Sequence, residues 1–368
     1  MHAIIAAWGR IRREIRPALP GLYLVIAVAI VARYTQGLIP WPPISRAISE
    51  VFIAVILGLH VRAFIGFGPR FAPGVQFALQ RILRLGIILL GLRLSLQDVV
   101  GTGVSALLLI LLCMTLALGL AYVLGKALGA PRRLALLIGV GAAICGNSAI
   151  VATAPVIEAQ DEQVSIAVAT ITCFGTLAVI FYPLIGVLLG ASDQAFGLWA
   201  GTAILDTSQV VAAGAAFSER ARDVATIVKL VRNTLMAPLI VVIGLFYARA
   251  MNRRAGTQRA RLSFAKIVPW FVIGFLSLVL ARTTGVALGI VPQDVSHPGS
   301  LTGAATFLKA LDEVAKFAIL MALSAIGLGA DMGAVRRTGV KPVLVGLITA
   351  SVLGVVSLGL IRFVFLGR

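Results

Sequence analysis

The chain has 368 residues, of which 60% are hydrophobic and only 12% are charged. A soluble domain carries about a quarter charged residues, so the composition excludes a soluble globular protein and predicts an all-α polytopic membrane protein. The net charge of +18 does not indicate nucleic-acid binding, because the Lys and Arg residues lie mostly in short loops, where they orient membrane helices.

Residues 1–18 form a short basic lead, and we expect no cleavable signal peptide, since the apolar run that follows lacks a small-residue cleavage site. Apolar segments then follow, each near the roughly 20 residues that a bilayer requires. The predicted spans are eleven: 19–39, 47–66, 77–98, 104–125, 134–157, 164–190, 197–216, 223–248, 267–290, 306–330 and 342–364.

The charges of the loops orient these spans. Basic residues gather in loops 67–76, 126–133, 249–266 and 331–341, whereas loop 158–163 is acidic. Cytoplasmic loops are enriched in Lys and Arg, so we predict a cytoplasmic amino terminus and a carboxyl terminus on the outer side.

An odd number of spans favours one extra helix, 19–39, followed by two five-helix repeats, 47–190 and 197–364, of which the second is inverted. Ser148-Ala-Ile150 in span five matches Ser324-Ala-Ile326 in span ten, five spans later and in the opposite direction. A second short echo pairs span three with span eight, so we predict an inverted repeat.

Span five contains the sequence GAAICGNSAIVATAP, in which Gly146, Asn147 and Ser148 interrupt an apolar run. Backbone that leaves helical geometry at membrane depth is tolerated only inside protein or along a cavity, and transporters place substrate at such breaks. A packing face of small residues is the alternative. GTAILDTSQVV, 201–211 in span seven, has a similar pattern but parallel orientation, so we interpret it as a second polar break and not as a repeat partner.

Ionisable side chains inside membrane spans indicate function by default. Lys229, Arg232 and Asn233 share one face of span eight. These cations would meet an anion, or else Lys229 would snorkel to the interface or a cation would pair with Asp206 of span seven.

Span ten carries Asp312 and Lys316 four residues apart, a spacing that favours an internal ion pair. These two residues are candidates for coupling or for that ion pair. Arg93 of span three is a secondary candidate for contact with an anion.

The polar breaks and the cations together predict a small oxyanion as cargo. A broken helix offers N–H groups and the positive end of a dipole, and arginine holds an oxyanion through two parallel bonds. An alternative is that Asp206 binds Na⁺ or carries a proton. The predicted substrate-binding residues are Gly146, Asn147, Ser148, Ala149, Thr207, Ser208, Lys229, Arg232, Asn233, Ser324 and Ala325.

Enzyme motifs are missing from the sequence, which has no P-loop, HExxH or CxxC pattern. The three cysteines and three histidines lack metal-ligand spacing. We therefore expect no enzymatic activity, no cofactor and no metal site.

Four motifs in order resemble the YeiH-type family of conserved bacterial membrane proteins, which is described as a family of sulfate exporters. They are GLRLSL at 91–96, GAAICGNSAIVATAPVI at 141–157, LDTSQV at 205–210 and KLVRNTLMAP at 229–238. The resemblance covers nearly the whole chain and implies the superfamily of bile-acid/sodium symporters and cation/proton antiporters. It further implies inverted five-helix repeats whose broken helices, here spans five and ten, cross each other.

The resemblance also implies a multi-pass protein of the bacterial inner membrane that exports sulfate or sulfite by alternating access. We expect the site where Gly146–Ala149 crosses Leu323–Ala325, with spans 4–6 and 9–11 as a core and spans 2, 3, 7 and 8 packed against it. The expected partners are a small inorganic anion, Na⁺ or H⁺ and membrane lipid, with a homodimer as an open question.

Two other functions stay open at this point. One is a Na⁺- or H⁺-coupled transporter of an organic acid, in which Asp206 and the breaks bind the cation. The other is a non-transporting membrane scaffold or sensor, which is disfavoured because a scaffold needs no buried arginine or broken helix.

Overall fold

The computed structural model describes residues 2–38, 50–64, 68–250, 270–289, 303–329 and 339–365. Within these ranges every regular element is a helix, as the composition predicts. The chain divides into two compact units, Met1–Ser95 with Gly274–Ala330, and Leu96–Ile273 with Asp331–Arg368.

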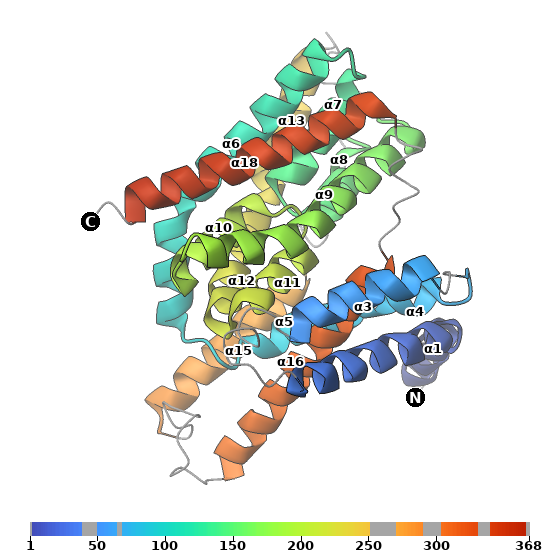
Figure 1. Ribbon diagram of the computed structural model, residues 1–368, viewed down its shortest axis with the longest axis vertical. Helices are drawn as coiled ribbons and strands as arrows, with labels where there is room; N and C mark the ends of the chain where they lie inside the picture. The colour runs from blue at the N-terminus through green and yellow to red at the C-terminus, as the bar shows by residue number, and fades with distance from the viewer. Residues whose placement is uncertain are drawn as a thin grey trace. The chain divides into compact units, whose positions relative to one another are not determined.

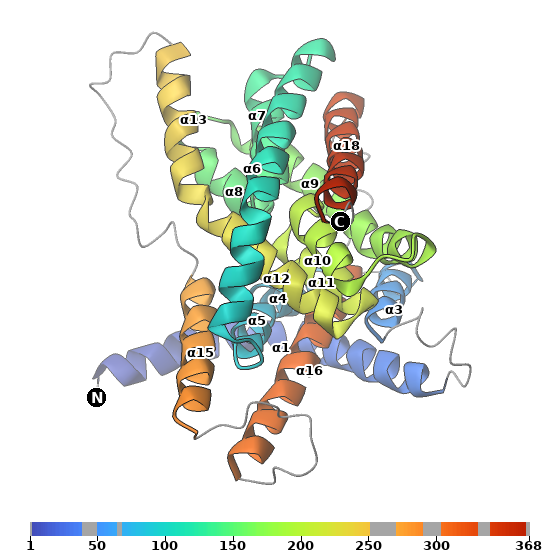
Figure 2. The ribbon, with the colours of Figure 1, turned by 90° about the vertical axis from the view of Figure 1, so that its left-hand side faces the viewer.

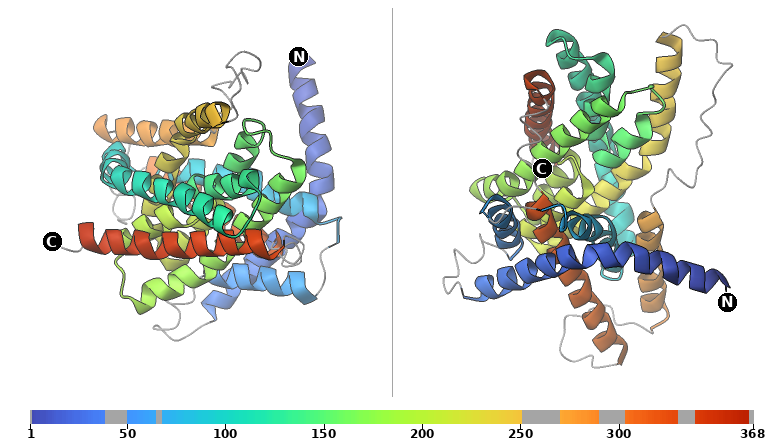
Figure 3. Two further views of the ribbon diagram at one scale, coloured as in Figure 1. Left: turned by 90° about the horizontal axis from the view of Figure 1, so that it is seen from above. Right: turned by 90° about the vertical axis from the view of Figure 1, so that its right-hand side faces the viewer.

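The first unit is a bundle in which α16 packs against α1, α3 and α5, and Figure 3 shows α1 crossing α16. At Gly58 of α3, an added Cβ would lie 2.7 Å from the carbonyl oxygen of Ser324, so the two helix backbones touch. Its described helices are α1 (His2–Gly37), α3 (Glu50–Phe64), α4 (Ala72–Phe77), the π-helix η1 (Ala78–Ile82), α5 (Leu83–Leu90), α16 (Gly303–Gly329) and most of α15 (Trp270–Ala287).

The second unit contains a large apolar core. In it α18 packs along α6 and α7 (Figure 1), and α12 packs against both α10 and α11 (Figure 2). Its described helices are α6 (Leu96–Ala127), α7 (Arg132–Ala143), α8 (Asn147–Thr153), α9 (Asp161–Leu188), α10 (Asp193–Ala203), α11 (Thr207–Phe217), α12 (Glu219–Thr234), α13 (Met236–Ala250) and α18 (Val340–Phe365).

Six of the described helical segments are long and apolar enough to cross a membrane, and α12 followed by α13, bent by 41°, would be a seventh. The six are Arg16–Gly37, Ala72–Leu90, Leu96–Ala127, Asp161–Leu188, Trp270–Ala287 and Val340–Phe363. This agrees with a polytopic membrane protein, while the count of eleven spans stays a prediction. Two of the other predicted spans are each divided into two short helices, α7 with α8 and α10 with α11.

The predicted break in span ten is wrong. α16 runs without interruption from Gly303 to Gly329, and the Ser324 hydroxyl donates to the carbonyl oxygen of Leu320 in its own helix, at 3.0 Å. Its Ser-Ala-Ile triplet follows Met, Ala and Leu, which are strong helix formers, and it lacks the Gly-Asn pair of span five. The second break instead lies in span seven.

The grouping of the helices also departs from the expected core. Spans seven and eight, which are α10 to α13, belong to the same compact unit as α6 to α9, whereas α16 belongs with α1 to α5. Gly146–Ala149 and Ser324–Ala325 therefore lie in different units, and the expectation that they cross stays a prediction.

Candidate functional site

The first break separates α7 from α8 at Ile144, Cys145 and Gly146. α7 ends at Ala143, and Gly146 adopts φ 71° and ψ −123°, a conformation that is open essentially to glycine alone. The helix therefore stops where the sequence predicts a polar interruption.

The second break separates α10 from α11 at Ile204, Leu205 and Asp206. Ile204 and Asp206 are extended, and Asp206 caps α11. Its Oδ1 accepts hydrogen bonds from the backbone N–H of Ser208 at 2.9 Å and from the Ser208 hydroxyl at 2.6 Å. An aspartate cap satisfies the unpaired N–H groups of a helix start, and it fixes the beginning of α11.

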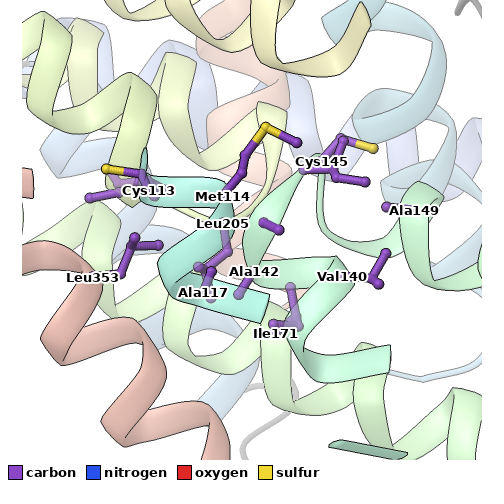
Figure 4. Packing of buried hydrophobic residues seen from close by; sticks show 14 of the residues in the cluster. Cys113, Met114, Ala117, Val140, Ala142, Cys145, Ala149, Ile171, Leu205 and Leu353 are labelled. Carbon is purple, nitrogen blue, oxygen red and sulfur yellow. The ribbon is translucent and has the colours of Figure 1, made fainter. Parts of the chain in front are cut away.

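The two breaks touch each other. An added Cβ on Gly146 would lie 2.9 Å from Asp206 Oδ2 and 3.3 Å from Asp206 Cα. Around the breaks, Ala142 and Cys145 of the first and Leu205 of the second belong to one buried apolar cluster (Figure 4). The span that sequence analysis set apart as a second polar break is thus the neighbour of the first.

α9 contacts the starts of α8 and α11, the helices that follow the two breaks. The Asn147 side chain and the Thr172 hydroxyl exchange hydrogen bonds at 3.2 and 3.3 Å. Gln209 Nε2 donates to the backbone carbonyl oxygen of Thr172 at 3.1 Å. Gly175 makes room for this amide, since an added Cβ would lie 1.7 Å from Gln209 Oε1.

Arg232 lies at the carboxyl ends of α7 and α10. Its Nε donates to the carbonyl oxygen of Ala143 at 2.6 Å, and Nη2 donates to that of Ala142. Nη1 donates to Thr202 at 2.9 Å and to Ile204 at 3.2 Å, with a longer contact to Gly201 at 3.4 Å. All three guanidinium nitrogens are therefore committed to backbone carbonyl groups.

These contacts complete the hydrogen bonds at the end of α7. The last four carbonyl groups of a helix lack partners within it. Here the carbonyl groups of Val140 and Gly141 accept from the N–H groups of Ile144 and Gly146, and the next two accept from Arg232. Arg232 thus replaces the missing turn of the broken helix.

Lys229 has the same role at the second break. Its Nζ donates to the carbonyl oxygens of Ile204 at 3.0 Å and Leu205 at 2.6 Å. Lys229 is 0% exposed and Arg232 is 1% exposed, so neither snorkels to an interface. Cations at helix carboxyl ends are stabilised by the dipole, which gives both side chains a structural partner.

Asn233 is 1% exposed and donates from Nδ2 to the Thr207 hydroxyl at 3.3 Å. Its Oδ1 is one of a few buried side-chain polar atoms without a hydrogen-bond partner among the described residues. Thr207 is the first residue of α11, so the unpaired oxygen belongs to a side chain held at the second break.

The predicted site residues of the breaks differ in exposure. Asn147, Asp206, Thr207 and Ser208 are half-buried and Ser148 is exposed, whereas Ala149 is buried. Within the second unit the structure therefore brings together the predicted residues of spans five, seven and eight. It orients neutral polar groups and one carboxylate around the break, with two cations behind them on the carbonyl side.

The remaining predicted residues belong to the first unit. Asp312 pairs with Lys316 at 3.1 Å, as the i, i+4 spacing predicts, and with Arg93 at 3.4 Å. Arg93, the secondary candidate for an anion, thus has an acidic partner. Ser324 and Ala325 are fully buried in α16.

Sequence reasoning missed Thr172 as part of the site and did not include Gln209 among its binding residues. Thr172 bonds to Asn147 at the start of α8 and to Gln209 in the first turn of α11. Thr172 and Thr176 lie four residues apart in a largely apolar span, and this polar pair on one helical face was the available signal.

Fold and site define a membrane protein, helical in its described regular elements, in which two helices break side by side inside one unit. A family model described as Conserved hypothetical protein 698 matches residues 20–346. The chain belongs to this family of UPF0324 membrane proteins, which confirms the YeiH-type resemblance.

Relatives from distant bacteria align over nearly the full chain. The chain is 36% identical over 355 residues to a UPF0324 membrane protein of Pseudomonas aeruginosa, and the alignment covers 94% of each protein. It is 35% identical over 346 residues to one of Streptococcus pyogenes, which covers 93% of this chain and 96% of the relative. It is 31% identical over 346 residues to one of Clostridium tetani, which covers 92% and 94%.

Proposed function

We propose that this protein is a secondary transporter of a small inorganic oxyanion, sulfate or sulfite, that works by alternating access. The observation that carries the proposal is the contact between two helix breaks, at Gly146 and Asp206, inside an apolar unit. Non-helical backbone at membrane depth is tolerated only where it is buried in protein or lines a cavity, and secondary transporters place their substrate sites at such breaks. A scaffold or sensor gains nothing from them.

The charge around the breaks supports an anion. Counted by formal charge, Lys229 and Arg232 contribute two positive charges and Asp206 one negative charge, a surplus of +1. Helix ends contribute roughly half a charge each, so the two carboxyl ends and the two amino ends cancel. A negatively charged solute balances the surplus.

We assign contact with the anion to neutral side chains rather than to Arg232. The guanidinium and Lys229 donate to carbonyl oxygens, whereas Asn147, Ser148, Thr207 and Ser208 are half-buried or exposed at the breaks. We leave Ser324 out, because its hydroxyl bonds within α16.

The same proposal includes a bacterial inner-membrane location and eleven spans, with the amino terminus in the cytoplasm and the carboxyl terminus outside. Basic loops such as 126–133 support this orientation. Single cysteines introduced at exposed Arg132 and Glu162 should be labelled by an impermeant thiol reagent from opposite sides of inner-membrane vesicles; labelling from one side only would contradict the topology.

The experiment is anion flux into proteoliposomes that contain the purified full-length protein, with radiolabelled sulfate and sulfite. Thr207→Val keeps the shape of the side chain but removes its hydroxyl, so flux should fall about tenfold, the equivalent of one hydrogen bond. Thr234→Val is the matched control, because Thr234 is exposed on α12 and bonds to Val231 in its own helix. Flux no greater than in empty liposomes for both anions would refute the proposal.

A Na⁺- or H⁺-coupled transporter of an organic acid is the second candidate. The half-buried Asp206 carboxylate favours it, since Oδ2 faces the first break at Gly146. Flux of small carboxylates that requires a Na⁺ or proton gradient, without flux of sulfate or sulfite, would establish this function instead.

A further inference from the structure

The strongest unexplained feature of the second unit is a buried oxygen that lacks a donor. Asn233 Nδ2 donates to Thr207, yet Asn233 Oδ1 has no hydrogen-bond partner within the part of the chain that the structure describes. Most buried polar atoms in proteins are paired, so an unpaired one requires an explanation. An acceptor of this kind is satisfied by a ligand that brings a hydrogen-bond donor.

A second acceptor lies at the same break. Asp206 caps α11, whose first residue, Thr207, accepts a hydrogen bond from Asn233. Asp206 Oδ1 accepts both hydrogen bonds from Ser208. Its Oδ2 points toward Gly146, where an added Cβ would approach it to 2.9 Å. The side chains at the second break therefore include an amide oxygen and a carboxylate group, both of which accept hydrogen bonds; the carboxylate also caps the backbone N–H of Gln209.

We propose that Asn233 and Asp206 make the site selective for an oxyanion that carries a proton, such as hydrogen sulfite, over fully ionised sulfate. This inference rests on the proposed function and names the substrate class of the same site. Sulfate offers only acceptor oxygens, which a carboxylate and an amide oxygen repel. Hydrogen sulfite has an O–H group that donates to one of them, and hydrogen bonds to a charged acceptor are strong.

The surplus charge supports the same choice independently. Lys229 and Arg232 against Asp206 leave +1, which a monoanion neutralises and a dianion exceeds. Both the hydrogen-bonding groups and the charge therefore favour a singly charged, protonated oxyanion.

Three anions separate charge from hydrogen bonding in proteoliposomes containing the full-length protein. Hydrogen sulfite is a monoanion with a donor, methanesulfonate is a monoanion without one, and sulfate is a dianion without one. Uptake is compared in a mildly acidic buffer in which hydrogen sulfite predominates. We expect hydrogen sulfite to be taken up at least about 10-fold faster than methanesulfonate, because a site built to pair with a hydroxyl rejects an analogue that lacks it. Sulfate should be slower still.

Asn233→Leu tests the assigned residue. It removes the amide oxygen at similar volume, so the ratio of hydrogen sulfite uptake to methanesulfonate uptake should shrink by about 10-fold. Thr234→Val, one residue further along α12 and exposed, should keep the wild-type preference.

The wild-type comparison needs no variant, so the inference is testable even if Asn233→Leu does not fold. Equal uptake of hydrogen sulfite and methanesulfonate, or faster uptake of sulfate, overturns the selectivity and leaves oxyanion transport standing. Faster uptake of sulfate would mean that an N–H group of Asn233 faces the solute. Absence of uptake for all three anions overturns both the inference and the proposed function.

Discussion

Replacing Arg232 tests whether it holds helix ends or binds an anion. Arg232→Ala leaves the carbonyl oxygens of Ala142, Ala143 and Thr202 without the donor that they have in the structure. Ile204 is affected less, because Lys229 also donates to it. The two helix carboxyl ends would then lack one of their two cations, and Lys229 would remain at the end of α10.

The expected loss of stability follows from these three groups. An unsatisfied buried polar group costs about 1–3 kcal/mol, while hydrogen bonds measured in a membrane protein average about 0.6 kcal/mol. Taking about 1–2 kcal/mol for each carbonyl group gives a loss of about 3–6 kcal/mol. For a unit of this size, 1 kcal/mol corresponds to roughly 2–4 °C, so Tm should fall by roughly 6–24 °C.

The assay is thermal unfolding of the purified protein in detergent, beside anion flux. Arg232→Lys keeps the charge but has a single nitrogen, so it should recover only part of the stability. Arg220→Ala is the matched control, since Arg220 is exposed near the start of the same helix and exposed substitutions change stability little. A wild-type Tm in Arg232→Ala together with abolished flux would refute the structural role and restore Arg232 as an anion ligand.

Two further substitutions probe the breaks and the first unit. Gly146→Ala should cost about 1–3 kcal/mol of stability, because Gly146 has a positive φ and abuts Asp206. The control Gly119→Ala in α6, where an added Cβ meets nothing within 4 Å, should cost nothing. Equal melting temperatures of the two variants would contradict the strained backbone at the break. Asp312→Asn should cost at most about 1 kcal/mol of stability and leave anion flux unchanged, since its ion pairs with Lys316 and Arg93 are partly exposed. Abolished flux at normal stability would instead assign Asp312 a role in coupling.

The membrane class and the first break were predictable because both depend on local chemistry. Composition determines how the chain partitions into a bilayer, and glycine at Gly146 permits a backbone conformation that other residues avoid. Asp206 was recognisable as part of a polar interruption for a similar reason, since aspartate favours the start of a helix.

The location of the second break was not predictable from matching triplets. Ser324-Ala-Ile326 copies Ser148-Ala-Ile150, but a serine within a helix bonds to the preceding turn, as Ser324 does with Leu320. A triplet that both helices tolerate carries no information about where a helix ends. The residues that mark a helix break are the glycine, Gly146, in span five and the capping aspartate, Asp206, in span seven.

The role of Arg232 could not be decided from sequence for a more basic reason. A guanidinium group recognises oxygen lone pairs, and both an oxyanion and a helix carboxyl end present them. Ala142 and Ala143 lie about 90 residues away along the chain, so only the folded unit reveals which oxygens are present.

The arrangement divides the work at the breaks between two kinds of side chain. Arg232 and Lys229 stay bonded to backbone carbonyl groups that cannot leave, so they stabilise the two carboxyl ends whether or not a solute is bound. Among the described residues, the side chains of Thr207, Ser208 and Asn147 hydrogen-bond only to neighbouring side chains, which a solute can replace at little cost. Variants of the cations should therefore lose stability first, whereas variants of the neutral residues should lose flux at nearly constant Tm. One melting curve and one flux measurement for each variant distinguish the two groups.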